Sequence, residues 1–145
     1  MIPVTKPHLP EMNRYLGYIE RCYENCQLTN NGPLVQELKA RLEGYLGVQN
    51  LLPVVNGTLA LQIAYRALGL SGKAITTPFT FVATSSSLRW EGIEPVFADI
   101  DGATLDLSPE RVREVLDPDV TALVPVHVYG NPCDVEAFDG IAREH

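Results

Sequence analysis

The chain has 145 residues, of which 46% are hydrophobic and 20% are charged, a balance typical of one soluble globular unit with a single core. Its net charge of −7 opposes binding to nucleic acid, because that binding depends on Lys and Arg side chains that meet phosphates. No apolar run approaches the roughly 18 residues of a membrane-spanning helix, and the first residues lack the pattern of a signal peptide. We therefore expect a cytoplasmic protein.

Residues 1–32 are expected to form an irregular N-terminal arm that contains a helix over residues 11–26. Cys22 and Cys26 lie in this segment, and their spacing would place them on one face of the helix. A zinc site needs more ligands than this pair supplies. We therefore expect Cys22, Cys26 and Cys133 to be buried, reduced thiols.

A second helix is predicted over residues 33–46, because Pro33 suits a first helical position and Gly47 suits the position after the end. This helix is expected to open the main domain, residues 33–145. Its apolar face is formed by Leu34, Leu38, Leu42, Tyr45 and Leu46.

From residue 51 onward, short β-branched runs alternate with helical patterns, which is typical of repeated βαβ units in an α/β fold with a parallel sheet. The predicted strands cover residues 51–55, 74–77, 95–100 and 122–129. The predicted helices cover residues 58–68, 81–90, 109–116 and 135–145. Ser108 and Asp134 are expected to cap the last two helices.

The sequence stops after a helical pattern, at the point where a βαβ series would continue with another strand. We therefore expect the parallel sheet to be incomplete, with exposed edges.

The segment Asn56-Gly57-Thr58 links the predicted strand 51–55 to the helix that follows. Gly57 allows a ligand to approach the backbone, Thr58 offers a hydroxyl, and the free N–H groups of a first helical turn attract an anion such as phosphate. An ordinary turn with a helix cap explains the same residues.

Four stretches follow one another along nearly the whole chain: LTNNGPLVQELKARLEGYLGV, NGTLALQIAYRALGL, ITTPFTFVATSSSLRWEGIEPVFADID and PVHVYGNPCDVEAF. In this order they resemble the DegT/DnrJ/EryC1/StrS family of sugar aminotransferases. The LTNNGP and GNPCD segments are most similar to the transaminases that form dTDP-4-amino-4,6-dideoxyglucose. The resemblance implies the large domain of fold-type I enzymes that depend on pyridoxal 5'-phosphate (PLP). It also implies a nucleotide-linked keto sugar as substrate, glutamate as the usual amino donor, and a homodimer.

Carried over to this sequence, the resemblance places Gly57 and Thr58 at the cofactor phosphate and stacks Phe81 on the cofactor ring. It places Asn131 at the cofactor pocket, although an Asn-Pro turn explains Asn131 equally well. Without the resemblance, Phe81 would be interpreted as a core aromatic residue.

The resemblance also places Asn30 and Asn31 near the substrate, across the homodimer interface. A loop that leads into a helix explains the two asparagines equally well. His127 is expected to be a hydrogen-bonded polar residue within a strand. Val55 stands where many relatives carry a serine near the phosphate.

The resemblance implies that two catalytic groups, the lysine that bonds to PLP and the aspartate that pairs with its ring nitrogen, come after residue 145. Lys6, Lys39 and Lys73 match neither context and are expected to be solvated. We therefore expect the N-terminal portion of an aminotransferase, inactive by itself. The alternative is a non-catalytic remnant that binds phosphate or self-associates. Residues 51–55 are expected to lack strand neighbours, while the other three strands stay adjacent.

Overall fold

A computed structural model describes residue 2 and residues 5–145 of the chain. The chain forms two compact units, Met1–Pro53 and Val54–His145. The predicted boundary between an arm and a main domain, after residue 32, stays a prediction.

The first unit contains α1 (Met12–Asn25) and α2 (Pro33–Leu46), and neither helix has a buried residue. α2 has the predicted bounds because Pro33 fits its first turn and Gly47 ends it at φ 66°, a left-handed conformation that glycine adopts without strain. Arg21 of α1 donates to Glu37 of α2 over 2.6 Å. The two predicted helices are confirmed.

The prediction that all three cysteines are buried is wrong for two of them. Cys22 is half-buried and Cys26 is exposed, whereas Cys133 is buried. Cys26 follows the last turn of α1 in a left-handed conformation, with φ 50°. It thereby leaves the helix face that it was expected to share with Cys22.

The second unit is an α/β domain with a three-stranded parallel sheet in the order β2-β1-β3. Its strands are β1 (Lys73–Thr76), β2 (Glu94–Phe97) and β3 (Val120–Leu123). Its helices are α3 (Gly57–Ala67), α4 (Ala83–Trp90), α5 (Pro109–Val115), the short 3-10 helix η1 (Val128–Gly130) and α6 (Val135–Glu144). The predicted fold class and the adjacency of the three later strands are confirmed.

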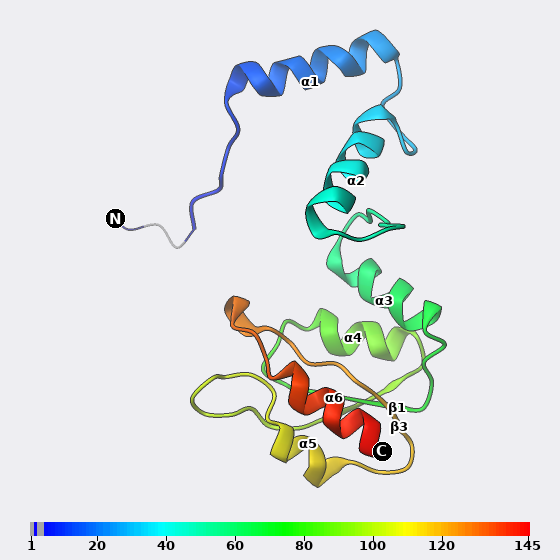
Figure 1. Cartoon of the computed structure of the whole chain (residues 1–145), viewed down its shortest axis with the longest axis vertical. Helices are drawn as coiled ribbons and strands as arrows, with labels where there is room; N and C mark the ends of the chain where they lie inside the picture. Colours follow the sequence, from blue (N-terminus) through cyan, green and yellow to red (C-terminus); the bar gives the residue numbers. More distant parts are fainter. Residues whose placement is uncertain (1, 3–4) are drawn as a thin grey trace. The chain divides into compact units, whose positions relative to one another are not determined.

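Helices cover both faces of the sheet, with α4 on one side and α5 and α6 on the other (Figure 1). The central strand β1 is buried on both faces, since Ala74 packs with Tyr65 and Leu88 while Ile75 packs with Val112 and Phe138. This alternation follows from the two-residue period of a strand.

Side-chain caps fix the starts of α5 and α6. Ser108 Oγ accepts a hydrogen bond from the backbone N–H of Arg111 over 3.4 Å, and Asp134 Oδ1 accepts one from Ala137 over 2.9 Å. Both predicted caps are therefore confirmed.

Three predicted strands differ from the structure. The predicted strand 95–100 ends early, since β2 ends at Phe97. Residues 51–55 form no strand, because no strand of the described chain pairs with them. This agrees with the expectation that they lack neighbours. The predicted strand 122–129 is also wrong in extent, since β3 ends at Leu123 and Pro125, which has no N–H, precedes a turn.

Candidate functional site

Parallel strands bring the loops that follow them to one edge of the sheet. The loop after β1 carries Phe81, and the loop after β3 carries His127 to Asn131. Open α/β sheets bind ligands at this carboxyl edge. These two loops lie around one cavity. The start of α3, in the same unit, Val54–His145, is a second candidate position, for an anion.

The start of α3 has free backbone donors. Asn56 is the N-cap, and its Oδ1 accepts from the N–H of Leu59 over 2.9 Å while its carbonyl oxygen accepts from Ala60 over 3.2 Å. Within the described chain, the N–H groups of Gly57 and Thr58 have no partner. These two amides and the helix dipole favour an anion at this point.

Space around Gly57 is open, since a Cβ placed on this residue would meet no atom within 4 Å. Thr58 is half-buried, and its hydroxyl has no hydrogen-bond partner among the described residues. The predicted helix start is therefore confirmed, although the strand expected before it is absent. Val55 is 81% exposed next to this helix start.

Phe81 lines an open cavity of about 590 Å³ at the carboxyl edge of the sheet. The ring of Phe81 is 77% exposed, so it is available to a ligand and is not a core residue. The cavity is lined by Pro78, Phe79, Thr80, Phe81, Thr84, Val126, His127, Val128 and Tyr129.

The loop after β3 also brings an aromatic side chain to this cavity, Tyr129, which the sequence did not indicate. Tyr129 is 92% exposed and lies edge-to-face with Phe79, with ring centroids 6.5 Å apart. Tyr129 has φ 53° and Gly130 has φ 84°. Gly130 and the Asn131-Pro132 pair after it are local signals of a tight turn at this place.

Asn131 is exposed and turns its side chain toward the loop before α5. Its Nδ2 donates to Asp106 Oδ2 over 2.8 Å and to the carbonyl oxygen of Thr104 over 3.1 Å. Asn131 is not among the residues that line the cavity, and neither are Gly57 and Thr58. The structure thus brings Phe81 together with His127 and Tyr129 around one cavity.

His127 lies before η1 and not within a strand, so that part of its prediction is wrong. Its hydrogen bonding is as expected, because Nδ1 accepts from the backbone N–H of Cys133 over 3.1 Å and lies 3.2 Å from Cys133 Sγ. Burial, and then the charge of Asp106, raise the pKa of the Cys133 thiol. Cys133 is therefore a protonated packing residue.

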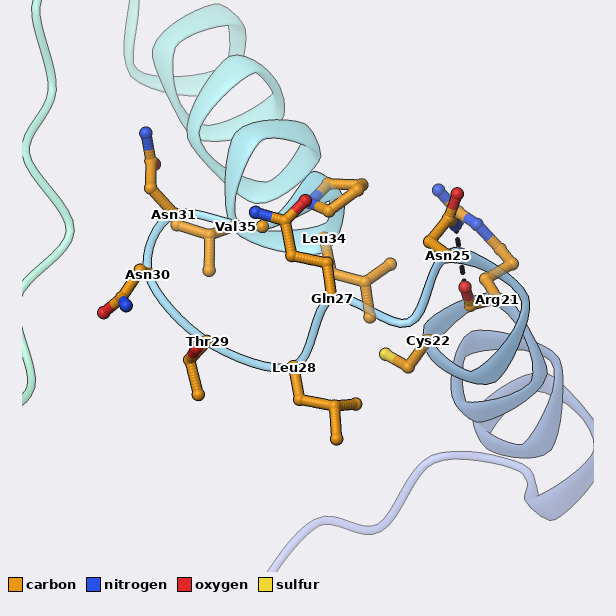
Figure 2. Close-up of a pocket in the computed structure, with 12 residues that line it drawn as sticks. Arg21, Cys22, Asn25, Gln27, Leu28, Thr29, Asn30, Asn31, Leu34 and Val35 are labelled. Atoms are coloured by element: carbon orange, nitrogen blue, oxygen red, sulfur yellow. Dashed lines mark hydrogen bonds between the residues drawn. The ribbon is translucent and has the colours of Figure 1, made fainter.

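Asn30 and Asn31 belong to the first unit, in the loop between α1 and α2. Both adopt left-handed conformations, with φ 55° and 62°. They line a cavity of about 200 Å³ together with residues such as Arg21, Cys22 and Thr29. Figure 2 shows the two asparagine side chains pointing outward from the loop, where their amides are accessible.

Lys73 is the one lysine of the second unit, and it does not line the cavity that Phe81 lines. Lys73 is the first residue of β1, so it lies at the amino end of the strands, whereas Phe81 follows their carboxyl end. It pairs with Asp117 over 2.7 Å and Asp119 over 3.4 Å. The hydrogen bond to Asp117 is the main reason that the pKa of Lys73 is raised.

In the part of the chain that the structure describes, no helix combines the length and the apolar composition of a membrane span. The same residues contain no cluster of His, Cys, Asp and Glu suited to a metal ion.

Known proteins resemble the chain over nearly its whole length. It is 46% identical over 142 residues to dTDP-4-amino-4,6-dideoxy-D-glucose transaminase of Shigella dysenteriae, a match that covers 98% of this chain and 39% of that protein. It is 33% identical over 147 residues to GDP-perosamine synthase of Vibrio cholerae, covering 100% of this chain and 40% of that protein. The chain thus spans about two fifths of the length of these relatives.

Solved structures share the fold. DesI in the presence of its TDP-sugar product superposes with a TM-score of 0.88 at 38% identity, over 96% of this chain and 36% of that one. Ntda from Bacillus subtilis with its bound cofactor PMP superposes with a TM-score of 0.86 at 25% identity, over 99% and 35%. The model of the DegT/DnrJ/EryC1/StrS aminotransferase family matches residues 11–145. The chain therefore belongs to the DegT/DnrJ/EryC1/StrS aminotransferase family.

Proposed function

We propose that this chain supplies the phosphate contact and the ring contact for PLP in an aminotransferase that transfers an amino group from glutamate to a nucleotide-linked keto sugar. The observation that carries the proposal is the 46% identity to a nucleotide-sugar transaminase over 98% of the chain. The free helix start at Gly57 and the exposed ring of Phe81 support it from the structure.

The residues present fit the phosphate group of PLP. Gly57 and Thr58 offer two backbone N–H groups and one hydroxyl that no described residue uses, beside open space. Three such donors at the positive end of a helix dipole can hold a phosphate without a lysine or arginine. We assign Gly57 and Thr58 to this contact.

Phe81 fits the role of a residue that stacks on the cofactor ring. An exposed aromatic ring at the carboxyl edge of the sheet provides a flat apolar surface that excludes water from one face of a ligand. When bound, PLP supplies an electron sink for the carbon that exchanges the amino group. The protein groups only bind and orient it at this place. We assign Asn131 to the cofactor pocket as well, because its side chain holds the turn that lines the cavity.

We further propose that the chain alone does not catalyse amino transfer. A proton must be moved between the donor and acceptor carbons, usually by a lysine that also bonds to the cofactor. Lys73 is ion-paired at the far edge of the sheet, and its raised pKa keeps it protonated. Lys6 and Lys39 match no catalytic context in the sequence.

We propose that the chain acts as part of a dimer, in which the arm, residues 1–32, and the main domain, residues 33–145, have different roles. Residues 1–32 form an arm whose Asn30 and Asn31 present amides to the sugar nucleotide bound by the partner copy. Residues 33–145 form part of the PLP-binding domain. The accessible amides of the loop support this assignment, as does its place in the matched region.

A chimera tests the function in a complete enzyme. This chain replaces the matching 142 residues of the Shigella dysenteriae transaminase. The proposal predicts that the chimera transfers an amino group from glutamate to the 4-keto sugar nucleotide. Phe81→Ala in the chimera is expected to lower the affinity for PLP.

The matched control is Phe97→Ala, at a half-exposed phenylalanine of β2 that lies outside the cavity. A chimera that folds and binds PLP but transfers no amino group to any nucleotide-linked keto sugar contradicts the proposal. It would support the alternative, a module that binds phosphate or self-associates without catalysis.

A further inference from the structure

Asp106 is the one charged side chain that is buried among residue 2 and residues 5–145, with 3% of its surface exposed. It lies in the loop between β2 and α5, two residues before the N-cap Ser108. Burying a carboxylate is costly unless hydrogen-bond donors replace the lost water. The hydrogen-bond donors to Asp106 therefore indicate which part of the fold its carboxylate stabilises.

The donors to Asp106 come from the turn after β3. The backbone N–H of Val128 lies 3.2 Å from Asp106 Oδ1, and it also lies 3.0 Å from the carbonyl oxygen of Val126. Asn131 Nδ2 donates to Asp106 Oδ2 over 2.8 Å. No ion pair joins Asp106 to a lysine or arginine of the described chain, so this turn alone compensates the charge.

The same turn has an unfavourable backbone that requires support. Tyr129 and Gly130 are two successive residues with positive φ, 53° and 84°, and this conformation is strained for tyrosine. The hydrogen bonds to Asp106 fall on Val128 and Asn131, on either side of these two residues. Asn131 also donates to Thr104 over 3.1 Å, so both of its amide hydrogens bind the loop before α5.

We propose that Asp106 is a positioning residue, whose buried carboxylate holds the Val128–Gly130 turn so that Tyr129 forms a wall of the cavity that Phe81 also lines. The idea that this wall contacts the cofactor rests on the proposed function. The hydrogen bonds between Asp106 and the turn do not depend on that function and can be measured without any ligand.

Asp106→Ala in the full chain tests the hold directly. Alanine has no acceptor oxygen, so Val128 and Asn131 both lose their partner at position 106. By NMR, we expect the amide of Val128 to exchange with solvent roughly 10-fold to 100-fold faster, the range for a lost hydrogen bond to a charged group. The ring resonances of Tyr129 should shift as its edge-to-face contact with Phe79 is lost. Asp139→Asn, at an exposed carboxylate of α6, should change neither signal.

A reciprocal exchange separates positioning from general stability. In the double variant Asp106→Asn with Asn131→Asp, the new amide at position 106 can donate to the new carboxylate at position 131 and still accept from Val128. Val128 should therefore stay nearly as protected as in the wild-type chain. Equal exchange in Asp106→Ala and the wild-type chain, or exchange in the double variant as fast as in Asp106→Ala, would overturn the proposal.

Asn131→Ala removes one of the same bonds from an exposed position, so it serves if Asp106→Ala unfolds the domain. Tyr129 should then become mobile while the sheet remains intact. An unchanged Tyr129 signal would overturn the proposal. The proposed function is tested separately, by binding of pyridoxamine phosphate to the wild-type chain. A failure to bind would contradict the proposed function and would leave these ligand-free measurements unaffected.

Discussion

Thr58 is the residue at which the phosphate assignment can be tested with least disturbance. Thr58→Val keeps the branched shape and the backbone N–H but removes the hydroxyl. We expect the dissociation constant for pyridoxamine phosphate to rise roughly 2-fold to 12-fold, since one neutral hydrogen bond contributes about 0.5–1.5 kcal/mol. Calorimetric titration measures this change, and the thermal midpoint should stay the same.

Ser86→Ala is the matched control, because Ser86 is an exposed hydroxyl residue of α4 outside the cavity. It should leave the affinity unchanged. If both variants bind as the wild-type chain does, Thr58 has no part in holding the phosphate.

Single residues were predictable from the sequence where local geometry alone decides their place. Gly57 and Thr58 follow an N-capping asparagine, so their free amides are a local property of the helix start. Asp106 and Tyr129 could not be predicted in the same way. Their contact depends on Asp106 meeting Val128, 22 positions later in the chain.

At the level of elements, Asn56 fixes the start of α3. Asn56→Ala removes the acceptor for the N–H of Leu59 and is expected to lower the free energy of unfolding by about 1 kcal/mol. Urea unfolding monitored by circular dichroism measures this loss. Asn56→Asp keeps an acceptor oxygen at the helix start and should retain nearly all of the stability. A full loss in both variants would show that the cap bond is not the cause.

The ion pair between β1 and the loop before β3 gives a pH dependence with a defined sign. Its hydrogen bond with Lys73 lowers the pKa of Asp117 below 3.8, and the same bond raises the pKa of Lys73 above 10.5. The contribution of Asp117 to the free energy of unfolding is therefore present above about pH 4 and is lost as the pH falls through its lowered pKa. The contribution of Lys73 is lost only as the pH rises through its raised pKa.

Asp117→Asn should therefore be less stable than the wild-type chain at pH 7, and the difference should disappear in strong acid. Urea midpoints measured from pH 2 to pH 8 test this. Asp119→Asn is the control, since its side chain is 74% exposed and lies farther from Lys73. A difference between Asp117→Asn and the wild-type chain that persists unchanged at pH 2 would contradict this explanation.

Elements with local start and stop signals were predicted best. α2 has its expected bounds because Pro33 and Gly47 act within one turn of the helix. Residues 51–55 have an equally clear β-branched pattern but form no strand, because a strand needs a neighbour to receive its hydrogen bonds. Composition cannot supply that neighbour, so the prediction failed there.

At the scale of the whole molecule, the free edge of β3 predicts self-association. Two cavities, of about 90 and 560 Å³, flank this strand, and Leu123 and Ala142 line both. An unpaired edge beside apolar cavities favours pairing with another chain. We expect light scattering to show that the chain forms oligomers at micromolar concentration.

Ala142→Lys places a charge beside this edge at an exposed helical position and should increase the monomer fraction. Ala67→Lys adds the same charge at the end of α3, outside both cavities, and should not. A wild-type chain that stays monomeric, or equal effects of the two lysines, would contradict a role for the β3 edge.

An NMR titration of the isotopically labelled chain with pyridoxamine phosphate tests whether the start of α3 and Phe81 hold the cofactor. This ligand has no aldehyde and so does not react with lysines. If these residues hold the cofactor, the amides of Gly57 and Thr58 and the ring of Phe81 will show saturable shifts, and inorganic phosphate will shift only the two amides. Saturable binding that leaves Gly57, Thr58 and Phe81 unshifted, or no binding at millimolar ligand, would contradict this assignment.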